Sequence, residues 1–195
     1  KRRTCIDCHM NPEPGNGGAP VAGQSTENGP VKERLYRHNF TGAQHPLVGL
    51  RNPALEQGSL ALLRASATLS ARIDGTVDNR QLVVRVTNVG AGHALPTGVA
   101  DFREIWLELT VTDANGNIVL TSGQPVNGAV PEDARLFRKV FGDAEGKPVG
   151  LKFWRYAKLL EDTRIPADGW RDEVWPLPAD AQGPFKADIR LNLRT

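Results

Sequence analysis

The sequence predicts a mainly β protein, an immunoglobulin-like antiparallel β-sandwich preceded by a loop-rich segment with a short helix. From Ala65 onward, apolar and polar residues alternate in several runs, which is typical of strands with one buried and one solvated face. Turn sequences separate these runs, and a stretch rich in glycine and proline precedes them. We therefore divide the 195-residue chain into residues 1–64 and residues 65–195.

The alternation is clearest in residues 65–73, 82–86, 105–111 and 185–193. Weaker strand candidates lie near residues 117–122, 135–141, 153–161 and 171–177. Turns are expected at residues 74–75, 113–116, 143–146 and 167–169. The resulting set of about seven or eight strands fits a two-sheet sandwich. Three tryptophans are expected to pack in its core or at its edges: Trp154, Trp170 and Trp175.

The first part of the chain has a different character. Nine of the twenty residues in 11–30 are glycine or proline, so we expect neither a helix nor a strand ladder there. A long loop of this kind is expected to wrap a neighbouring group. Asn52 followed by Pro53 predicts the start of a helix that continues through residues 54–63, is weakened by Gly58, and connects the two parts.

Composition excludes several classes of protein. The formal net charge of +2 indicates no preference for nucleic acid, and no run approaches the ~18 apolar residues of a membrane span. The two cysteines cannot form a disulfide framework for a chain of this size. The chain lacks an initiator methionine and begins four residues before its first cysteine, so we interpret it as a processed or truncated product.

Residues 5–9 read Cys-Ile-Asp-Cys-His, the signature of a c-type haem. In such a site two thiols add across the two vinyl groups of the porphyrin, and the two-residue gap between them matches the vinyl spacing. The histidine follows directly, so that its imidazole reaches the iron from the same side. The sequence therefore predicts covalent haem c on Cys5 and Cys8, with His9 as the proximal iron ligand.

Three other interpretations of the cysteine pair remain open but explain less. A thioredoxin-like redox pair normally lies in a βαβ unit, which the surrounding sequence does not suggest. A structural zinc site needs four ligands, and the histidine directly after Cys8 would then have no explanation. A disulfide between Cys5 and Cys8 would close a small, strained ring.

The sixth ligand of the iron is sought among the remaining histidines and the single methionine. Met10 adjoins His9 and cannot readily reach the opposite face of the same haem, so bis-histidine ligation is favoured. The candidates for the distal ligand are His38, His45 and His93. One haem accepts one distal ligand, so surplus histidines would serve haems in a missing part of the chain or in a partner.

Three motifs carry a resemblance to a known family. They are Cys5 to Met10, the segment His38-Asn39-Phe40-Thr41-Gly42-Ala43-Gln44-His45-Pro46, and the segment from Val86 through His93 to Gly98. Together they resemble the C-terminal part of bacterial multihaem c-type cytochromes, and residues 162–166 look like the β domain of that family. The resemblance implies chains of closely spaced bis-histidine haems in the periplasm or at the cell surface. This chain departs from the pattern because it has a single C-x-x-C-H motif.

We therefore expect a c-type cytochrome, a subunit or fragment of a multihaem protein, that transfers electrons rather than catalysing a reaction. Two alternatives stay open: part of a multihaem oxidoreductase, and an assembly or adhesion domain whose haem is structural. The expected cofactor is haem c with its iron. The expected partners are another haem-bearing chain or missing haem domains, together with redox proteins, and not nucleic acid.

Overall fold

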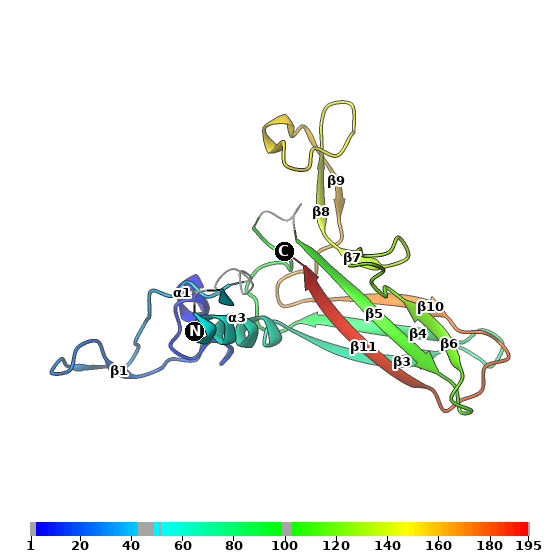
Figure 1. The fold of residues 1–195 in the computed structure, drawn as a ribbon, viewed down its shortest axis with the longest axis horizontal. Helices are drawn as coiled ribbons and strands as arrows, with labels where there is room; N and C mark the ends of the chain where they lie inside the picture. Colours follow the sequence, from blue (N-terminus) through cyan, green and yellow to red (C-terminus); the bar gives the residue numbers. More distant parts are fainter. Residues whose placement is uncertain (1–2, 43–48, 51, 99–102, 195) are drawn as a thin grey trace. The chain divides into compact units, whose positions relative to one another are not determined.

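The computed structural model describes residues 3–42, 49–50, 52–98 and 103–194 of the chain (Figure 1). The chain forms two compact units. The first comprises Lys1–Thr68 and Asn88–Gly92, and the second comprises Leu69–Thr87 and His93–Thr195. The assignment of residues 1–64 as a haem-binding segment and of residues 65–195 as a separate domain stays a prediction.

The first unit contains helix α1 (Cys5–His9), strands β1 (Gly23–Gln24) and β2 (Val31–Lys32), and helix α3 (Pro53–Arg64). Strands β1 and β2 form a short antiparallel ladder. The prediction that residues 11–30 hold no ladder is therefore wrong at Gly23–Gln24. Each strand of this hairpin contributes only two residues. The side-chain amide of Gln24 donates to the Gly29 carbonyl oxygen at 2.7 Å and so helps to close the hairpin, although the segment has no longer run of β-forming residues.

Helix α3 begins where the sequence predicts. The Asn52 side chain accepts hydrogen bonds from the backbone N–H groups of Ala54 and Leu55, at 3.0 and 3.3 Å. The predicted weak point, Gly58, has a packing role, because a Cβ there would lie 3.3 Å from Pro14 Cγ. The missing side chain lets the glycine- and proline-rich loop lie against the helix. The loop therefore packs against α3 at Pro14.

The second unit is built from antiparallel strands, two of which (β3 and β4) have one end in the first unit. The strands are β3 (Ala67–Asp74), β4 (Gln81–Asn88), β5 (Glu104–Thr112), β6 (Ile118–Ser122), β7 (Arg135–Phe137), β8 (Lys139–Gly142), β9 (Lys158–Asp162), β10 (Trp170–Pro176) and β11 (Lys186–Arg194). One sheet has the order β10-β4-β3. The other has the order β11-β5-β6, with β7 also paired to β5. Strands β8 and β9 form a separate two-stranded ladder (Figure 1).

The core of this unit follows the predicted alternation. On β4 and β5 the apolar side chains of alternate positions are buried: Leu82, Val84, Val86, Ile105, Leu107, Leu109 and Val111. The mainly β class with antiparallel sheets is confirmed, and the arrangement is consistent with a sandwich-like fold. Strand β3 is less buried than the alternation predicts, with Ile73 39% exposed. The reason is that β3 lies at the edge of its sheet and has a neighbour on one side only.

Two details of the prediction are wrong. Residues 153–155 form a short 3-10 helix, η2 (Phe153–Arg155), and the predicted strand near 153–161 begins only at Lys158. Trp175 is buried as expected and Trp170 lies on the edge strand β10, but Trp154 is exposed in η2. The Arg85 guanidinium lies 4.9 Å from the centre of the Trp170 ring, so this tryptophan is held on the surface by a cation rather than in the core. The core instead takes Trp106, whose indole N–H donates to the Gly123 carbonyl oxygen at 3.0 Å.

Candidate haem-binding site

Helix α1 gathers the three residues of the predicted haem motif. At 3.6 residues per turn, Cys5, Cys8 and His9 fall within an arc of about 100° on one side of the helix. Cys5 is exposed, Cys8 is half-buried, and both thiols are free of a disulfide. The strained disulfide is thus not formed, and both sulfur atoms belong to one helical face.

Asp7, the third residue of α1, stabilises the N-terminus of this helix through its side chain. Its buried carboxylate accepts hydrogen bonds from the Thr4 backbone N–H at 2.7 Å and from the Tyr36 hydroxyl at 2.9 Å, and it pairs with Arg34. The bond from Thr4 and the hydroxyl of Tyr36 lower the pKa of Asp7 to about 2. Asp7 therefore stays ionised and ties residues 34–36 to the haem motif.

Residue 41 positions His9. The backbone N–H of Thr41 donates to the His9 carbonyl oxygen at 2.8 Å, and His9 Nδ1 lies 2.5 Å from the Thr41 carbonyl oxygen. A carbonyl oxygen can only accept, so Nδ1 donates in this contact and Nε2 is the nitrogen that would bind a metal. Histidines that bind a metal typically have their second ring N–H held in this way.

The glycine- and proline-rich loop closes around Cys8. The side-chain amide of Asn11 donates to the carbonyl oxygens of Asp7 and Ala19, at 2.7 and 2.9 Å, and so holds the middle of the loop beside α1. A Cβ at Gly18 would lie only 3.0 Å from Cys8 Sγ, and Gly18 has a φ of +75°. The loop thus passes close to the sulfur atom only because residue 18 is a glycine.

Two thiols and an adjacent imidazole on one helical face are the donor set that a c-type haem requires. Burial raises the pKa of the Cys8 thiol above its ordinary value. Among the residues that the structure describes, no group of three or more His, Cys, Asp or Glu side chains could hold a metal ion. A haem iron needs no such cluster, because the porphyrin supplies four of its ligands and the protein only the axial ones.

Comparison with known proteins gives one likeness of fold. No family model matches the chain, and no curated protein matches it. Among solved structures, the chain is similar to a penta-heme cytochrome c552 from Thermochromatium tepidum, with a TM-score of 0.54 and 22% sequence identity. The match covers 96% of this chain and 46% of that one, so the chain spans less than half of that cytochrome's length. The chain thus shares its fold with part of a multihaem cytochrome.

The three candidate distal histidines have different surroundings. His38 is exposed in a turn of the first unit, with its ring 6.4 Å from that of Phe40. The neighbouring Arg37 donates its backbone N–H to the Met10 carbonyl oxygen at 2.8 Å, so this turn lies beside the end of α1. His45 lies outside the described residues.

His93 lies in the predicted loop between β4 and β5, half-buried, with Nδ1 3.1 Å from the Ala94 carbonyl oxygen. The residues directly before it, Asn88–Gly92, belong to the first unit. The backbone N–H groups of Val89 and Gly90 both donate to the Ser66 carbonyl oxygen, which lies just beyond α3. His93 itself belongs to the second unit.

Thr41, Asp7 and Tyr36 were not found by sequence reasoning. The spacing Thr4-x-x-Asp7 resembles a capping box and could have indicated the role of Asp7. Thr41 lies 32 positions from His9 and acts through its backbone, so its residue type carries no signal.

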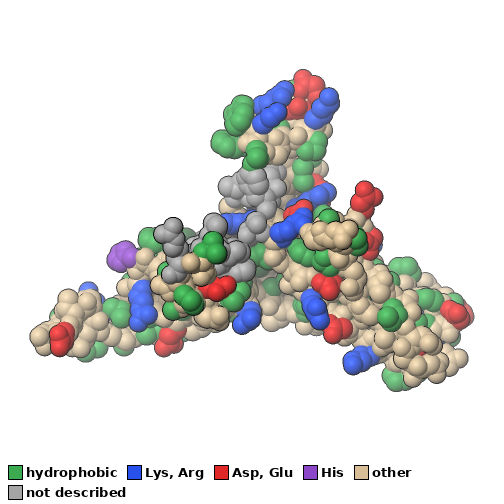
Figure 2. All heavy atoms as spheres, in the orientation of Figure 1, with side chains coloured by type: hydrophobic (Ala, Val, Ile, Leu, Met, Phe, Trp, Pro, Cys, Tyr) green, Lys and Arg blue, Asp and Glu red, His purple; other side chains and the backbone are tan. Residues whose placement is uncertain are grey.

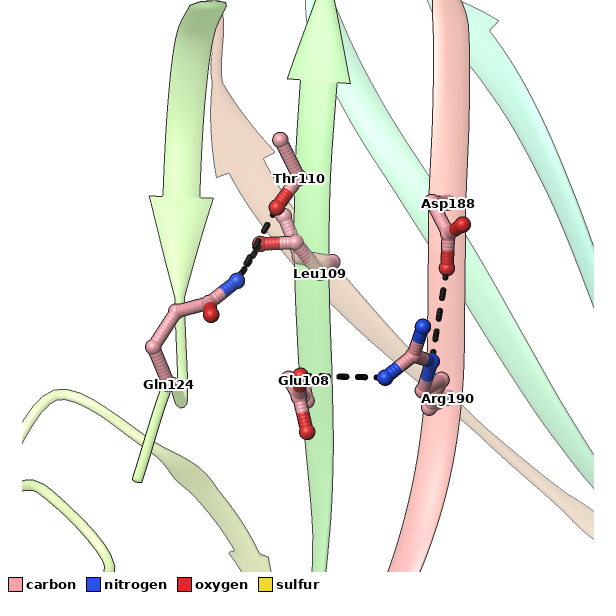
Figure 3. A pocket seen from close by; sticks show the side chains of 6 residues that line it. All are labelled: Glu108, Leu109, Thr110, Gln124, Asp188 and Arg190. Carbon is pink, nitrogen blue, oxygen red and sulfur yellow. Dashed lines mark hydrogen bonds and ion pairs between the residues drawn. The ribbon is translucent and has the colours of Figure 1, made fainter. Parts of the chain in front are cut away.

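A shallow polar depression on the second unit carries no sign of function (Figure 3). Gln124 donates to the Thr110 hydroxyl at 2.9 Å, and Arg190 lies 3.7 Å from Glu108 and 3.6 Å from Asp188. The lining groups thus pair with one another.

Among the described residues, no helix is long and apolar enough to cross a membrane.

Proposed function

We propose that this chain is a c-type cytochrome, corresponding to the C-terminal portion of a multihaem cytochrome, and that it carries electrons through a covalently bound haem c. Cys5 and Cys8 would form the thioether bonds and His9 would bind the iron. The observation that carries the proposal is the arrangement on α1, where both thiols and His9 share one face and the Thr41 carbonyl oxygen holds His9 Nδ1. The fold shared with a penta-heme cytochrome supports it.

Haem c supplies one-electron chemistry, and the residues of this chain would set its conditions. The Thr41 carbonyl oxygen fixes the orientation of the His9 imidazole and makes it a stronger ligand. Gly18 and the loop that Asn11 closes would shield the Cys8 side of the porphyrin. A second histidine as the distal ligand would leave no open coordination position and would give a lower potential than a methionine.

We propose His93 as the first candidate for the distal ligand, with His38 and His45 as donors to this haem or to neighbouring ones. The argument for His93 is its place in a loop framed by glycine and proline between two strands, where a histidine is a plausible ligand. The surplus histidines fit an assembly in which a further haem-bearing chain or domain lies nearby. The motifs of the multihaem family favour a location in the periplasm or at the cell surface, with redox proteins as partners.

Carbon monoxide and cyanide separate an electron carrier from part of an oxidoreductase. The reduced holoprotein should bind no carbon monoxide at native pH, and the oxidised holoprotein no cyanide, because two histidines occupy both axial positions. Rapid binding of either ligand would contradict the proposal and favour an enzyme with an open or displaceable position. A reduction potential outside the reach of any physiological partner would favour a structural haem in an assembly domain.

A further inference from the structure

Residues 139–162 form a hairpin, hereafter the arm, and no other strand that the structure describes pairs with it. Strands β8 and β9 pair with each other and stand apart from both larger sheets. Figure 1 shows the arm extending away from the other strands of the second unit. A two-stranded ladder is only marginally stable in water unless something packs against it. Among the described strands of the second unit, none supplies the cover that such a ladder usually needs.

The far part of the arm presents large apolar side chains to solvent. Phe153 and Trp154 are 70% and 71% exposed, and their rings meet edge to face with centres 5.5 Å apart. Further exposed apolar side chains of the arm are those of Leu151, Tyr156, Leu159 and Leu160. Figure 2 shows hydrophobic side chains on this projection, with basic and acidic ones beside them. So many exposed large apolar side chains in one short segment are unusual for surface that only meets water.

The exposure is built into the arm rather than being the result of a loose loop. Val149 is buried and donates its backbone N–H to the Phe141 carbonyl oxygen at 2.9 Å. The Phe141 ring meets Tyr156 with centres 4.7 Å apart, and Ala157 donates to the Gly142 carbonyl oxygen at 2.9 Å. These contacts hold both ends of the segment that displays Phe153 and Trp154.

Basic residues accompany the aromatic ones. Residues 147–160 contain four of them and no acidic residue: Lys147, Lys152, Arg155 and Lys158. The acidic residues at the base of the arm are already engaged, since Glu161 binds Arg138 and Asp162 binds Arg164. Glu145 lies in the preceding turn, and Asp143 accepts the backbone N–H of Lys147 at 2.8 Å. The segment around Phe153 and Trp154 is therefore positively charged.

We propose that the arm docks on an anionic lipid surface, with Phe153 and Trp154 entering the headgroup region and the neighbouring cations meeting lipid phosphates. Aromatic side chains with tryptophan among them favour the membrane interface, and lysine and arginine next to them are attracted by anionic lipid. A convex tip needs no matching groove in a fluid bilayer. Residues 143–160 carry four basic and two acidic side chains, a net charge of +2, so a tip-to-tip contact would bring two like net charges together, which disfavours the second copy as the occupant. This proposal does not depend on the haem.

Flotation of the full-length holoprotein with lipid vesicles tests the proposal. It should float with vesicles of phosphatidylcholine and phosphatidylglycerol at low salt, less so as salt rises, and not with phosphatidylcholine alone. The paired substitutions Phe153→Ser with Trp154→Ser, and separately Lys152→Gln with Arg155→Gln, should each weaken binding by at least ~10-fold. Two matched controls in the same unit, Trp170→Ser at an exposed aromatic and Arg190→Gln at an exposed cation, should leave binding unchanged.

Three results would overturn the proposal. The wild-type protein fails to float with anionic vesicles, or the arm variants float as well as the Trp170→Ser control. The third result is a concentration-dependent dimer in sedimentation that does not bind vesicles and is lost in the Phe153→Ser, Trp154→Ser variant. That third result would make another copy of the chain the occupant of the arm. Circular dichroism of each variant establishes that the fold is retained.

Discussion

Thr41 contacts His9 at two backbone atoms: its N–H donates to the His9 carbonyl oxygen, and its carbonyl oxygen lies 2.5 Å from His9 Nδ1. The contact joins two segments 32 positions apart and fixes both the main chain and the ring of the proposed iron ligand. Because both contacts use the backbone, the side chain at position 41 makes neither of them.

Thr41→Pro removes the N–H that holds the His9 carbonyl oxygen, whereas Thr41→Ser keeps both backbone contacts. We expect the proline variant to incorporate several-fold less covalent haem and to show an altered circular dichroism in the Soret band. The serine variant should resemble the wild type in both measurements. Equal haem content and spectra in all three proteins would show that Thr41 does not position His9.

Gly18→Ala tests how closely the loop must approach Cys8. An added Cβ would lie 3.0 Å from Cys8 Sγ in a backbone of φ +75°, so the variant suffers both crowding and strain. Gly17→Ala is the matched control, because its φ is +69° but its nearest contact is the flexible end of Arg3 at 3.5 Å. Covalent haem per polypeptide should fall in Gly18→Ala well below the level in Gly17→Ala. A similar yield in both would mean that strain alone, and not the contact with Cys8, matters.

His93→Ala tests the proposed distal ligand. Loss of a strong axial nitrogen should convert the ferric absorption spectrum from low-spin to high-spin, because a water molecule or an empty position gives a weaker field. His38→Ala, prepared in parallel, should keep the low-spin spectrum. An unchanged spectrum in His93→Ala would contradict the assignment and move it to His38 or His45.

Acid stability tests the ion pair at the base of β9. Asp162 accepts two hydrogen bonds from Arg164, at 2.8 and 2.7 Å, and these lower its pKa below the ordinary value. The pKa of Asp162 is therefore lower in the folded protein than in the unfolded chain, where it is about 4. The ionised carboxylate stabilises the fold above about pH 4, and this stabilisation is lost as the pH falls through the pKa of the folded protein. Asp162→Asn should reduce the free energy of unfolding at pH 7 by ~0.5–1 kcal/mol, discounted for solvent screening, and the difference should shrink in acid.

Denaturation in urea, followed by far-ultraviolet circular dichroism between pH 2 and 7, measures this difference. Asp188→Asn is the control, because Asp188 lies 3.6 Å from Arg190 in a more exposed pair. It should change the free energy of unfolding less than Asp162→Asn does. A constant difference between wild type and Asp162→Asn at every pH would rule out the ionised carboxylate as its source.

The parts of the site that were predictable are local in sequence. Cys5, Cys8 and His9 lie within five residues, so the motif was recognisable from the sequence, and helix α1 brings the three side chains to one face. The start of α3 was predictable for the same reason, since Asn52 and Pro53 act on the residues directly after them. The alternation of apolar and polar residues likewise predicted the core strands, because residues two positions apart in a strand face the same side of the sheet.

The parts that were not predictable depend on distant packing. The role of Thr41 arises only when the chain returns to His9, and a backbone contact leaves no mark on the residue type. Trp154 was expected to pack in the core or at an edge because of its residue type, but it is exposed, and Trp106 is buried in the core. Gly58 was expected only to weaken helix α3, but its lack of a side chain lets Pro14 pack against the helix, a contact that the sequence does not reveal.

Mass analysis of the tryptic peptide of residues 4–32 tests the central claim most directly, since it contains both cysteines and no internal cleavage site. The protein should be produced with a working c-type maturation system and treated with an alkylating reagent before digestion. We predict a peptide heavier by one haem, with neither cysteine alkylated, because both thiols are consumed as thioethers. A peptide of bare polypeptide mass carrying two alkylated cysteines would contradict the account.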